Sequence, residues 1–191
     1  VRSAKCDLGI AFDGDADRIG FVDNKGRVVP MDLVTALLAE ELLATHQNAT
    51  ILYDLRSSRA VKERIEAKGG IAHECKVGHS NIKKQMIEEG ALLAGEASGH
   101  YYFALSGYVA EMGVLPAILI MNLMARTGKK LSELVDEVRH YAHSGEVNLE
   151  VSDPKGVMQK LREHYVDATI SELDGIKIVY ETWWFSLRAS N

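Results

Sequence analysis

The sequence predicts an α/β protein with a mixed, largely parallel sheet and flanking helices. Apolar and β-branched runs recur through the first two thirds of the chain, helically spaced segments lie between several of them, and polar clusters follow the runs. Strands joined through helices run parallel and carry their binding groups in loops at their carboxyl ends. We also expect an N-terminal hairpin with an acidic loop and a partial α+β domain at the C-terminus.

The strands and helices of the first part follow from local patterns. Short apolar runs predict strands at Leu8–Phe12, Ile19–Val22, Thr50–Tyr53, Ile71–Val77 and Leu92–Ala94. Apolar residues at helical spacing predict helices at Met31–His46, Arg59–Lys68, Asn81–Glu89, 114–126 and 131–142.

The pattern changes after residue 143. Val147, Leu149 and Val151 alternate as in an antiparallel strand, and Asp153-Pro154 predicts a capped helix through about His164. Ile176–Tyr180 and Trp183–Leu187 are predicted as paired strands. We therefore place a domain boundary near Ser144-Gly145.

Composition excludes several classes of function. A net charge of −5 and the absence of a basic stretch argue against a nucleic-acid partner. The most apolar segment, 114–124, is too short for a bilayer, which needs about 20 apolar residues. Cys6 and Cys75 have no spacing typical of zinc or a disulfide framework. A protein of the reducing cytoplasm, with no membrane partner, is the simplest expectation.

The run 13–18 carries three carboxylates at alternate positions, Asp13, Asp15 and Asp17, directly after a predicted strand. Such clustering is typical of a site for a hard cation such as Mg²⁺, and Gly14 is expected to let the backbone bend around the ion. Arg18 suits a phosphate beside the metal. The alternative is a solvated acidic turn.

Other interpretations of the run 13–18 fit less well or remain open. An EF-hand requires glycine and glutamate where this chain has Arg18 and Asn24. A phosphotransferase site with two aspartates also follows an apolar strand and remains compatible with Asp13 and Asp15.

The segment 95–100 places Glu96, Ser98 and His100 between and beside two glycines. A carboxylate and a hydroxyl can bond vicinal hydroxyls, and an imidazole can donate to a sugar or phosphate oxygen, so this segment favours a polyol ligand. A turn whose glycines merely permit positive φ is the alternative.

Three further segments carry polar groups at places where anions bind. His79 and Lys83 follow a predicted strand at a helix start, and Arg56 follows the strand 50–53. For each of these two segments taken alone, a capped helix start with solvated basic side chains is the preferred alternative. At the end of the chain, Arg188, Ser190 and Asn191 are suited to gripping a phosphate.

Together these motifs resemble the α-D-phosphohexomutase superfamily, in its phosphomannomutase/phosphoglucomutase branch. The resemblance rests on Asp13-Gly14-Asp15-Ala16-Asp17-Arg18, then Gly95-Glu96-Ala97-Ser98-Gly99-His100, then Arg188-Ala189-Ser190-Asn191, in this order. It implies an enzyme that interconverts hexose 1-phosphate and 6-phosphate through a phosphoserine and a bisphosphorylated sugar.

The resemblance also implies roles for these residues. Asp13, Asp15 and Asp17 would hold Mg²⁺, and Arg18 would lie beside the phosphoryl group. Glu96, Ser98 and His100 would hold the sugar. His79 and Lys83 would line the cleft, and Arg56 would act as an acid/base or charge stabiliser. Arg188, Ser190 and Asn191 would begin a phosphate grip. By this resemblance, 1–30 closes a second domain, 31–143 is a third and 144–191 opens a fourth.

The chain departs from the family pattern in several places. No Thr-Ala-Ser-His-Asn-Pro-like phosphoserine loop occurs in it, and Glu111 stands where relatives have an aspartate pattern. We therefore expect a fragment that is inactive alone and needs the phosphoserine domain of the same polypeptide. Phosphoglucosamine mutase, a Mg²⁺-dependent two-aspartate phosphatase and a non-catalytic phosphosugar-binding module remain alternatives.

Overall fold

A five-stranded mixed sheet forms the centre of the first part of the protein. The computed structural model describes residues 1–189. The chain divides into two units, Val1–His143 and Ser144–Asn191. The strand order is β5-β4-β6-β7-β8, with β4 parallel to both β5 and β6, and with β6–β7 and β7–β8 antiparallel. These strands are β4 (Thr50–Asp54), β5 (Ile71–Cys75), β6 (Leu93–Gly95), β7 (Tyr101–Leu105) and β8 (Tyr108–Glu111).

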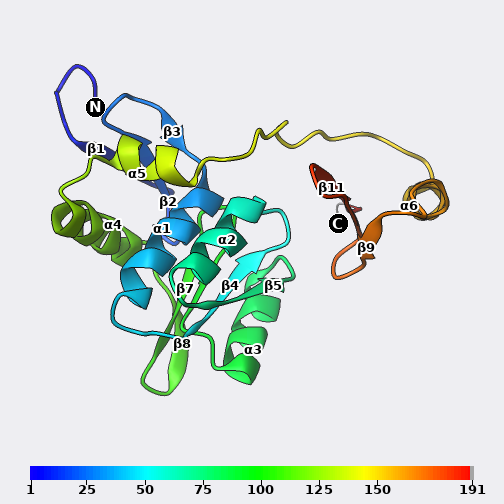
Figure 1. Ribbon diagram of the computed structural model, residues 1–191, viewed down its shortest axis with the longest axis horizontal. Coiled ribbons are helices and arrows are strands. Elements are labelled where there is room, and N and C mark those ends of the chain that lie inside the picture. Colours follow the sequence, from blue (N-terminus) through cyan, green and yellow to red (C-terminus); the bar gives the residue numbers. More distant parts are fainter. Residues whose placement is uncertain (190–191) are drawn as a thin grey trace. The chain divides into compact units, whose positions relative to one another are not determined.

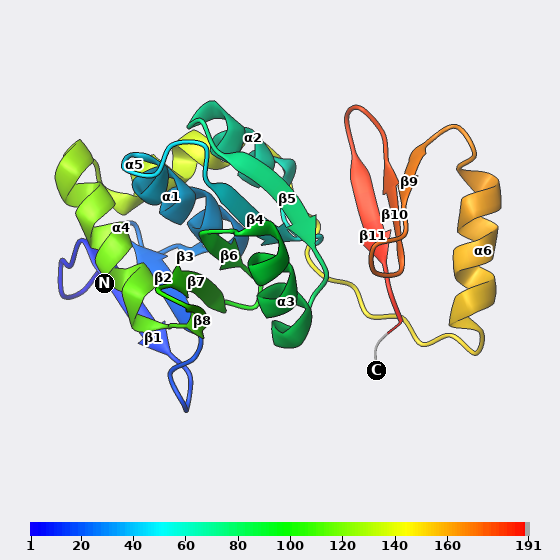
Figure 2. The same ribbon diagram turned by 90° about the horizontal axis from the view of Figure 1, so that it is seen from below.

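Helices cover both faces of this sheet (Figures 1 and 2). Because neighbouring residues of a strand face opposite sides, Ile51 and Tyr53 join the larger core while Leu52 joins the smaller one. The larger core packs against α1 (Met31–Leu43), α2 (Arg59–Ala67), α4 (Val114–Thr127) and α5 (Leu131–Val138). The smaller core packs against α3 (His79–Glu89). The prediction of an α/β protein with a mixed sheet is confirmed.

The N-terminal strands form a separate antiparallel sheet in the order β1-β2-β3, with β1 (Leu8–Phe12), β2 (Ile19–Asp23) and β3 (Val28–Val29). Ile19, Phe21 and Val29 are buried in the larger core together with the helices around α1. The acidic turn between β1 and β2 is thereby anchored to the α/β body.

The unit Ser144–Asn191 contains α6 (Pro154–His164) and an antiparallel sheet in the order β11-β10-β9. The strands are β9 (Thr169–Ser171), β10 (Ile176–Val179) and β11 (Trp184–Leu187). Asp153 caps α6 by accepting a hydrogen bond from the backbone N–H of Gly156 at 2.9 Å, and Pro154 occupies the first turn, as predicted.

One predicted strand is wrong. Val147, Leu149 and Val151 lie outside any strand and are exposed, at 69%, 73% and 46%. Alternation alone predicts a strand only where one face finds a core, and these three side chains find none among the described residues. The strands β3, β7, β8 and β9 were not predicted from the sequence. The helix predicted at 131–142 is shorter in the structure and ends at Val138.

None of the helices described between residues 1 and 189 has the length and apolar character needed to span a bilayer.

Candidate metal and sugar site

The acidic turn joins β1 to β2, whose last paired residues are Phe12 and Ile19. One oxygen each from Asp13, Asp15 and Asp17 lies within 4.8 Å of the others. The left-handed residue of the turn is Ala16, with φ of 61°, and its N–H donates to the carbonyl of Asp13 at 3.3 Å. The bend expected at Gly14 is therefore made two residues later, and Gly14 has no positive φ.

Arg18 closes the turn onto Asp13. Its Nε donates to Asp13 Oδ2 at 2.6 Å, and its backbone N–H donates to Oδ1 at 3.2 Å. Burial acts to raise the pKa of Asp13, but the hydrogen bonds from Arg18 outweigh it and hold that pKa below its ordinary value. Asp13 therefore stays ionised, as a ligand for a cation must.

A second observation, at Asp17, indicates that the acidic turn can bind a cation. Asp17 Oδ1 is shielded from solvent and accepts no hydrogen bond from a described residue, and Arg18 Nε lies 3.7 Å away. A shielded carboxylate oxygen without a donor, among two other carboxylates, is the kind of oxygen ligand that a hard cation takes.

The sugar loop, which we define as residues 95–100 between β6 and β7, pairs directly with the acidic turn. Arg18 and His100 form an isolated antiparallel bridge, and the N–H of Ile19 donates to the carbonyl of Gly99 at 3.2 Å. Gly99 has φ of 94°, and a Cβ there would lie 3.0 Å from the carbonyl oxygen of Ile19. Only glycine suits this close approach.

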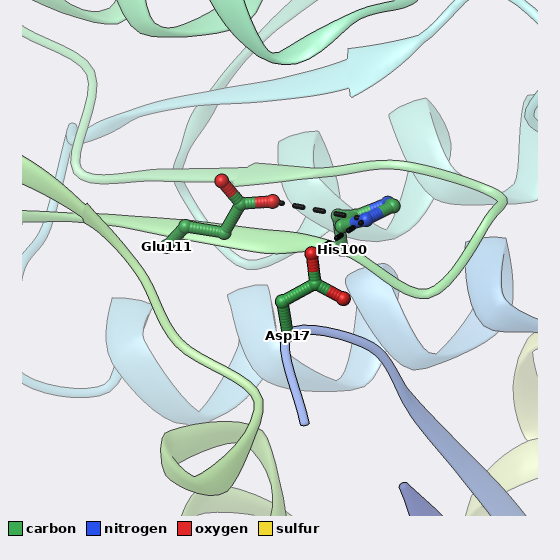
Figure 3. Close-up of side chains that lie close together, drawn as sticks. All are labelled: Asp17, His100 and Glu111. Carbon is green, nitrogen blue, oxygen red and sulfur yellow. Dashed lines mark ion pairs between the residues drawn. The ribbon is translucent and has the colours of Figure 1, made fainter. Parts of the chain in front are cut away.

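His100 lies close to the carboxylates of Asp17, in the acidic turn, and Glu111, at the end of β8 (Figure 3). Its Nε2 is 3.5 Å from Asp17 Oδ2 and 3.8 Å from Glu111 Oε1. On the other edge of the ring, Nδ1 is 2.7 Å from Ser98 Oγ and 3.4 Å from Glu96 Oε2. The acidic turn and the sugar loop therefore share one polar cluster, which can meet hydroxyl or phosphate oxygens.

Lys83 adds a positive charge to this cluster through its ion pair with Glu111, at the end of β8. Lys83 Nζ donates to Glu111 Oε2 at 3.1 Å and lies 5.6 Å from the centroid of the Tyr102 ring. Burial, followed by the carboxylate of Glu111, raises the pKa of Tyr102. The carboxylate of Glu111 is therefore part of the cluster, although the expected family pattern at this position is an aspartate.

Arg56 reaches the cluster from the loop after β4. Its Nη2 donates to Asp54 Oδ2 at 2.7 Å and to Glu96 Oε1 at 3.2 Å. Glu96 is only 6% exposed, so this ion pair is well shielded. The cation predicted at position 56 therefore lies against the predicted sugar-binding acid.

Comparison with known proteins identifies this architecture. Residues 30–141 match the family described as "Phosphoglucomutase/phosphomannomutase, alpha/beta/alpha domain III". The chain belongs to the phosphoglucomutase/phosphomannomutase family. This family consists of enzymes, and the superfamily resemblance that the motifs carry is confirmed.

Its relatives within the family are longer. A phosphomannomutase of Methanocaldococcus jannaschii is 48% identical over all of this chain, which covers 42% of that protein. A phosphohexose mutase of Xanthomonas campestris is 37% identical, with 43% of its length covered. A solved structure of a phosphoglucomutase/phosphomannomutase family protein from Burkholderia thailandensis is 32% identical, with a TM-score of 0.85. The match covers 96% of this chain and 40% of that protein. The chain therefore spans less than half the length of these relatives.

Most residues expected from the phosphohexomutase resemblance meet in one unit. Hydrogen bonds, ion pairs and the close grouping of carboxylates join eight of them, Asp13, Asp15, Asp17, Arg18, Glu96, Ser98, His100 and Arg56, and Lys83 joins through Glu111. His79 is exposed at the first residue of α3, one turn before Lys83. Arg188 lies in the other unit, with Nη1 4.0 Å from Asp174 Oδ2. Ser190 and Asn191 lie outside the described residues.

The family pattern did not lead us to two residues that shape this site. Asp54 is completely buried and bonds both Arg56 and the sugar loop. A Cβ at Gly113 would lie 2.4 Å from the carbonyl oxygen of Ala16, so Gly113 allows α4 to begin directly against the acidic turn. Asp54 could have been noticed as the polar residue that directly follows the predicted parallel strand Thr50–Tyr53, whereas Gly113 gives no local signal.

Proposed function

We propose that this chain supplies the metal-binding and sugar-binding parts of a phosphohexomutase, which interconverts hexose 1-phosphate and hexose 6-phosphate. The observation that carries the proposal is the pairing of Arg18 with His100, because it joins the acidic turn and the sugar loop. A cation site beside hydroxyl-binding groups is suited to phosphoryl transfer on a sugar. The mutase names of the relatives support the same reaction.

Asp13, Asp15 and Asp17 are the proposed Mg²⁺ ligands. Their grouping within 4.8 Å and the shielded Asp17 Oδ1 support this assignment. When bound, Mg²⁺ would neutralise charge that develops on the transferred phosphoryl group.

The other side chains are proposed to orient the sugar phosphate. Arg18 is exposed beside Asp13, which its Nε bonds. Its other guanidinium nitrogens would donate to phosphoryl oxygens. Ser98 and Glu96 would bond sugar hydroxyls, with His100 donating to a hydroxyl or phosphate oxygen. Arg56, Lys83 and His79 would line the cleft and offset the charge of the phosphates.

The remaining parts of the reaction are proposed to come from elsewhere in the polypeptide. A phosphoserine domain would supply the phosphoryl group, and the C-terminal domain begun by 144–191 would grip the distal phosphate through Arg188, Ser190 and Asn191. The 191-residue chain alone is then inactive. We place the enzyme in the reducing cytoplasm, which fits its two free cysteines, Cys6 and Cys75.

The test is a coupled assay with glucose 1-phosphate, mannose 1-phosphate and glucosamine 1-phosphate as substrates. We expect the product of the whole gene to convert glucose 1-phosphate or mannose 1-phosphate to the 6-phosphate, and the 191-residue chain to convert neither. Preference for glucosamine 1-phosphate would instead indicate a phosphoglucosamine mutase. Mg²⁺-dependent release of inorganic phosphate by the chain alone would indicate a phosphatase. Binding of hexose phosphate without any turnover by the whole gene product would indicate a binding module.

A further inference from the structure

The side chain of Asp54 is completely buried at the end of β4. Its Oδ1 accepts a hydrogen bond from the backbone N–H of Arg56 at 2.8 Å. Its Oδ2 accepts from Arg56 Nε at 3.2 Å, from Arg56 Nη2 at 2.7 Å and from the backbone N–H of Ala97 at 2.7 Å. A buried carboxylate is costly unless its oxygens are satisfied, and here both oxygens are.

These bonds close a ring between two loops that are far apart in sequence. Ala97 lies within the sugar loop, and Arg56 also reaches Glu96 of that loop at 3.2 Å. The β4 loop and the sugar loop are thus tied by one backbone bond to Asp54 and one ion pair to Glu96. The two ties fix the sugar loop on one side and the Arg56 guanidinium on the other.

We propose that Asp54 is a positioning residue that holds the sugar loop and Arg56 in the geometry required to bind the hexose ring. This inference rests on the proposed mutase function, and it assigns Asp54 no contact with the substrate. Asparagine cannot replace Asp54, because all four groups that face the carboxylate are donors. An Asn side chain would place its NH₂ group opposite either the backbone N–H of Arg56 or the other three donors.

Asp23 provides a matched control. It is 1% exposed, and it accepts from the N–H groups of Lys25 and Arg27 at 2.8 and 2.9 Å and from Arg27 Nε at 2.7 Å. Asp23→Asn therefore removes the same type of buried aspartate–arginine pair, with the same kind of cost to stability, at a turn outside the sugar loop.

The first readout is amide hydrogen exchange at Ala97 in the 191-residue chain. Asp54→Asn should speed exchange of this amide by about tenfold or more, because its charged acceptor is replaced by a neutral carbonyl oxygen or by an NH₂ group. Asp23→Asn should leave it within about twofold of the native rate. Unchanged protection of Ala97 in Asp54→Asn would overturn the proposal. If Asp54→Asn does not fold, Asp54→Ser, which keeps an accepting oxygen but does not reach Ala97, takes its place.

The second readout is kinetic and uses the whole gene product. Asp54→Asn should raise KM for the hexose phosphate by about tenfold, whereas Asp23→Asn should lower the melting temperature without moving KM. Equal effects of both variants on KM would reduce Asp54 to a purely structural role. Absence of mutase activity in the native enzyme would refute the proposed function, and the exchange rate of Ala97 would still decide whether Asp54 holds the sugar loop.

Discussion

Asp17 is the residue at which the proposed metal site and sugar site meet. It belongs both to the group formed with Asp13 and Asp15 and to the group formed with His100 and Glu111. Its Oδ2 faces His100, while its Oδ1 is shielded and accepts no hydrogen bond from the described residues. A cation held by Oδ1 would satisfy the oxygen that the protein leaves without a donor.

We predict that Asp17→Asn weakens Mg²⁺ binding by at least about tenfold, because it removes a charged ligand from the acidic turn. Titration calorimetry on the 191-residue chain measures this directly. Asp7→Asn, which removes an exposed carboxylate of the preceding segment, serves as the control and should change affinity little. Equal affinities of Asp17→Asn and the native chain would place the cation elsewhere.

At the scale of elements, the site depends on how closely α4 approaches the acidic turn. Helix α4 begins after Gly113, whose missing side chain makes room for the carbonyl of Ala16. Ala16 in turn holds the left-handed conformation of the turn, which costs an alanine about 1 kcal/mol. The packing of α4 thus helps to impose the geometry of the three carboxylates.

We predict that Gly113→Ala lowers Mg²⁺ affinity several-fold, since the new Cβ must push the backbone at Ala16. The matched control is Gly14→Ala, because a Cβ at Gly14 meets nothing within 4 Å and no positive φ is required there. Calorimetric Mg²⁺ titrations of the two variants should therefore differ. A larger loss in Gly14→Ala than in Gly113→Ala would contradict this account of the turn.

The elements themselves were predictable to different degrees. Helices such as α1 and α2 and strand β2 follow from local periodicity, because each has a face that packs into a core. Strand β4 follows from its short, continuous apolar run. The hairpin of β7 and β8 was missed, since Tyr101, Tyr102 and Phe103 are consecutive and all buried, and periodicity does not separate a buried strand from a buried helix segment in so short a run. The strand expected around Leu149 was wrong because its alternation has no core to face.

The structure brings together most of the site residues that the sequence singled out, and their roles stay predictions. The motifs of the acidic turn and the sugar loop suggest a chemistry by residue type and order, but they do not predict the contacts. The bridge between Arg18 and His100, the bond from Ala97 to Asp54 and the approach of Gly113 to Ala16 join segments distant in sequence. Such contacts result from tertiary packing, which spacing along the chain does not encode.

At the scale of the whole molecule, the two units carry different parts of the proposed function. The unit Val1–His143 holds the acidic turn and the sugar loop, whereas Ser144–Asn191 holds Arg188. The division of the first unit at residue 30 stays a prediction, although β2 and β3 share a core with α1. Since the chain spans 42% of its relative from Methanocaldococcus jannaschii, we propose that turnover requires the rest of the polypeptide.

The central claim is that the acidic turn holds the metal for phosphoryl transfer on the sugar bound beside it. The most direct test is the turnover number for hexose 1-phosphate isomerisation by the whole gene product carrying Asp15→Asn, at saturating Mg²⁺. Asp15 is the exposed member of the three carboxylates, so its replacement should leave the fold, monitored by circular dichroism, unchanged. We predict a fall in turnover of at least about 100-fold. A folded Asp15→Asn enzyme with a near-native rate would contradict the claim.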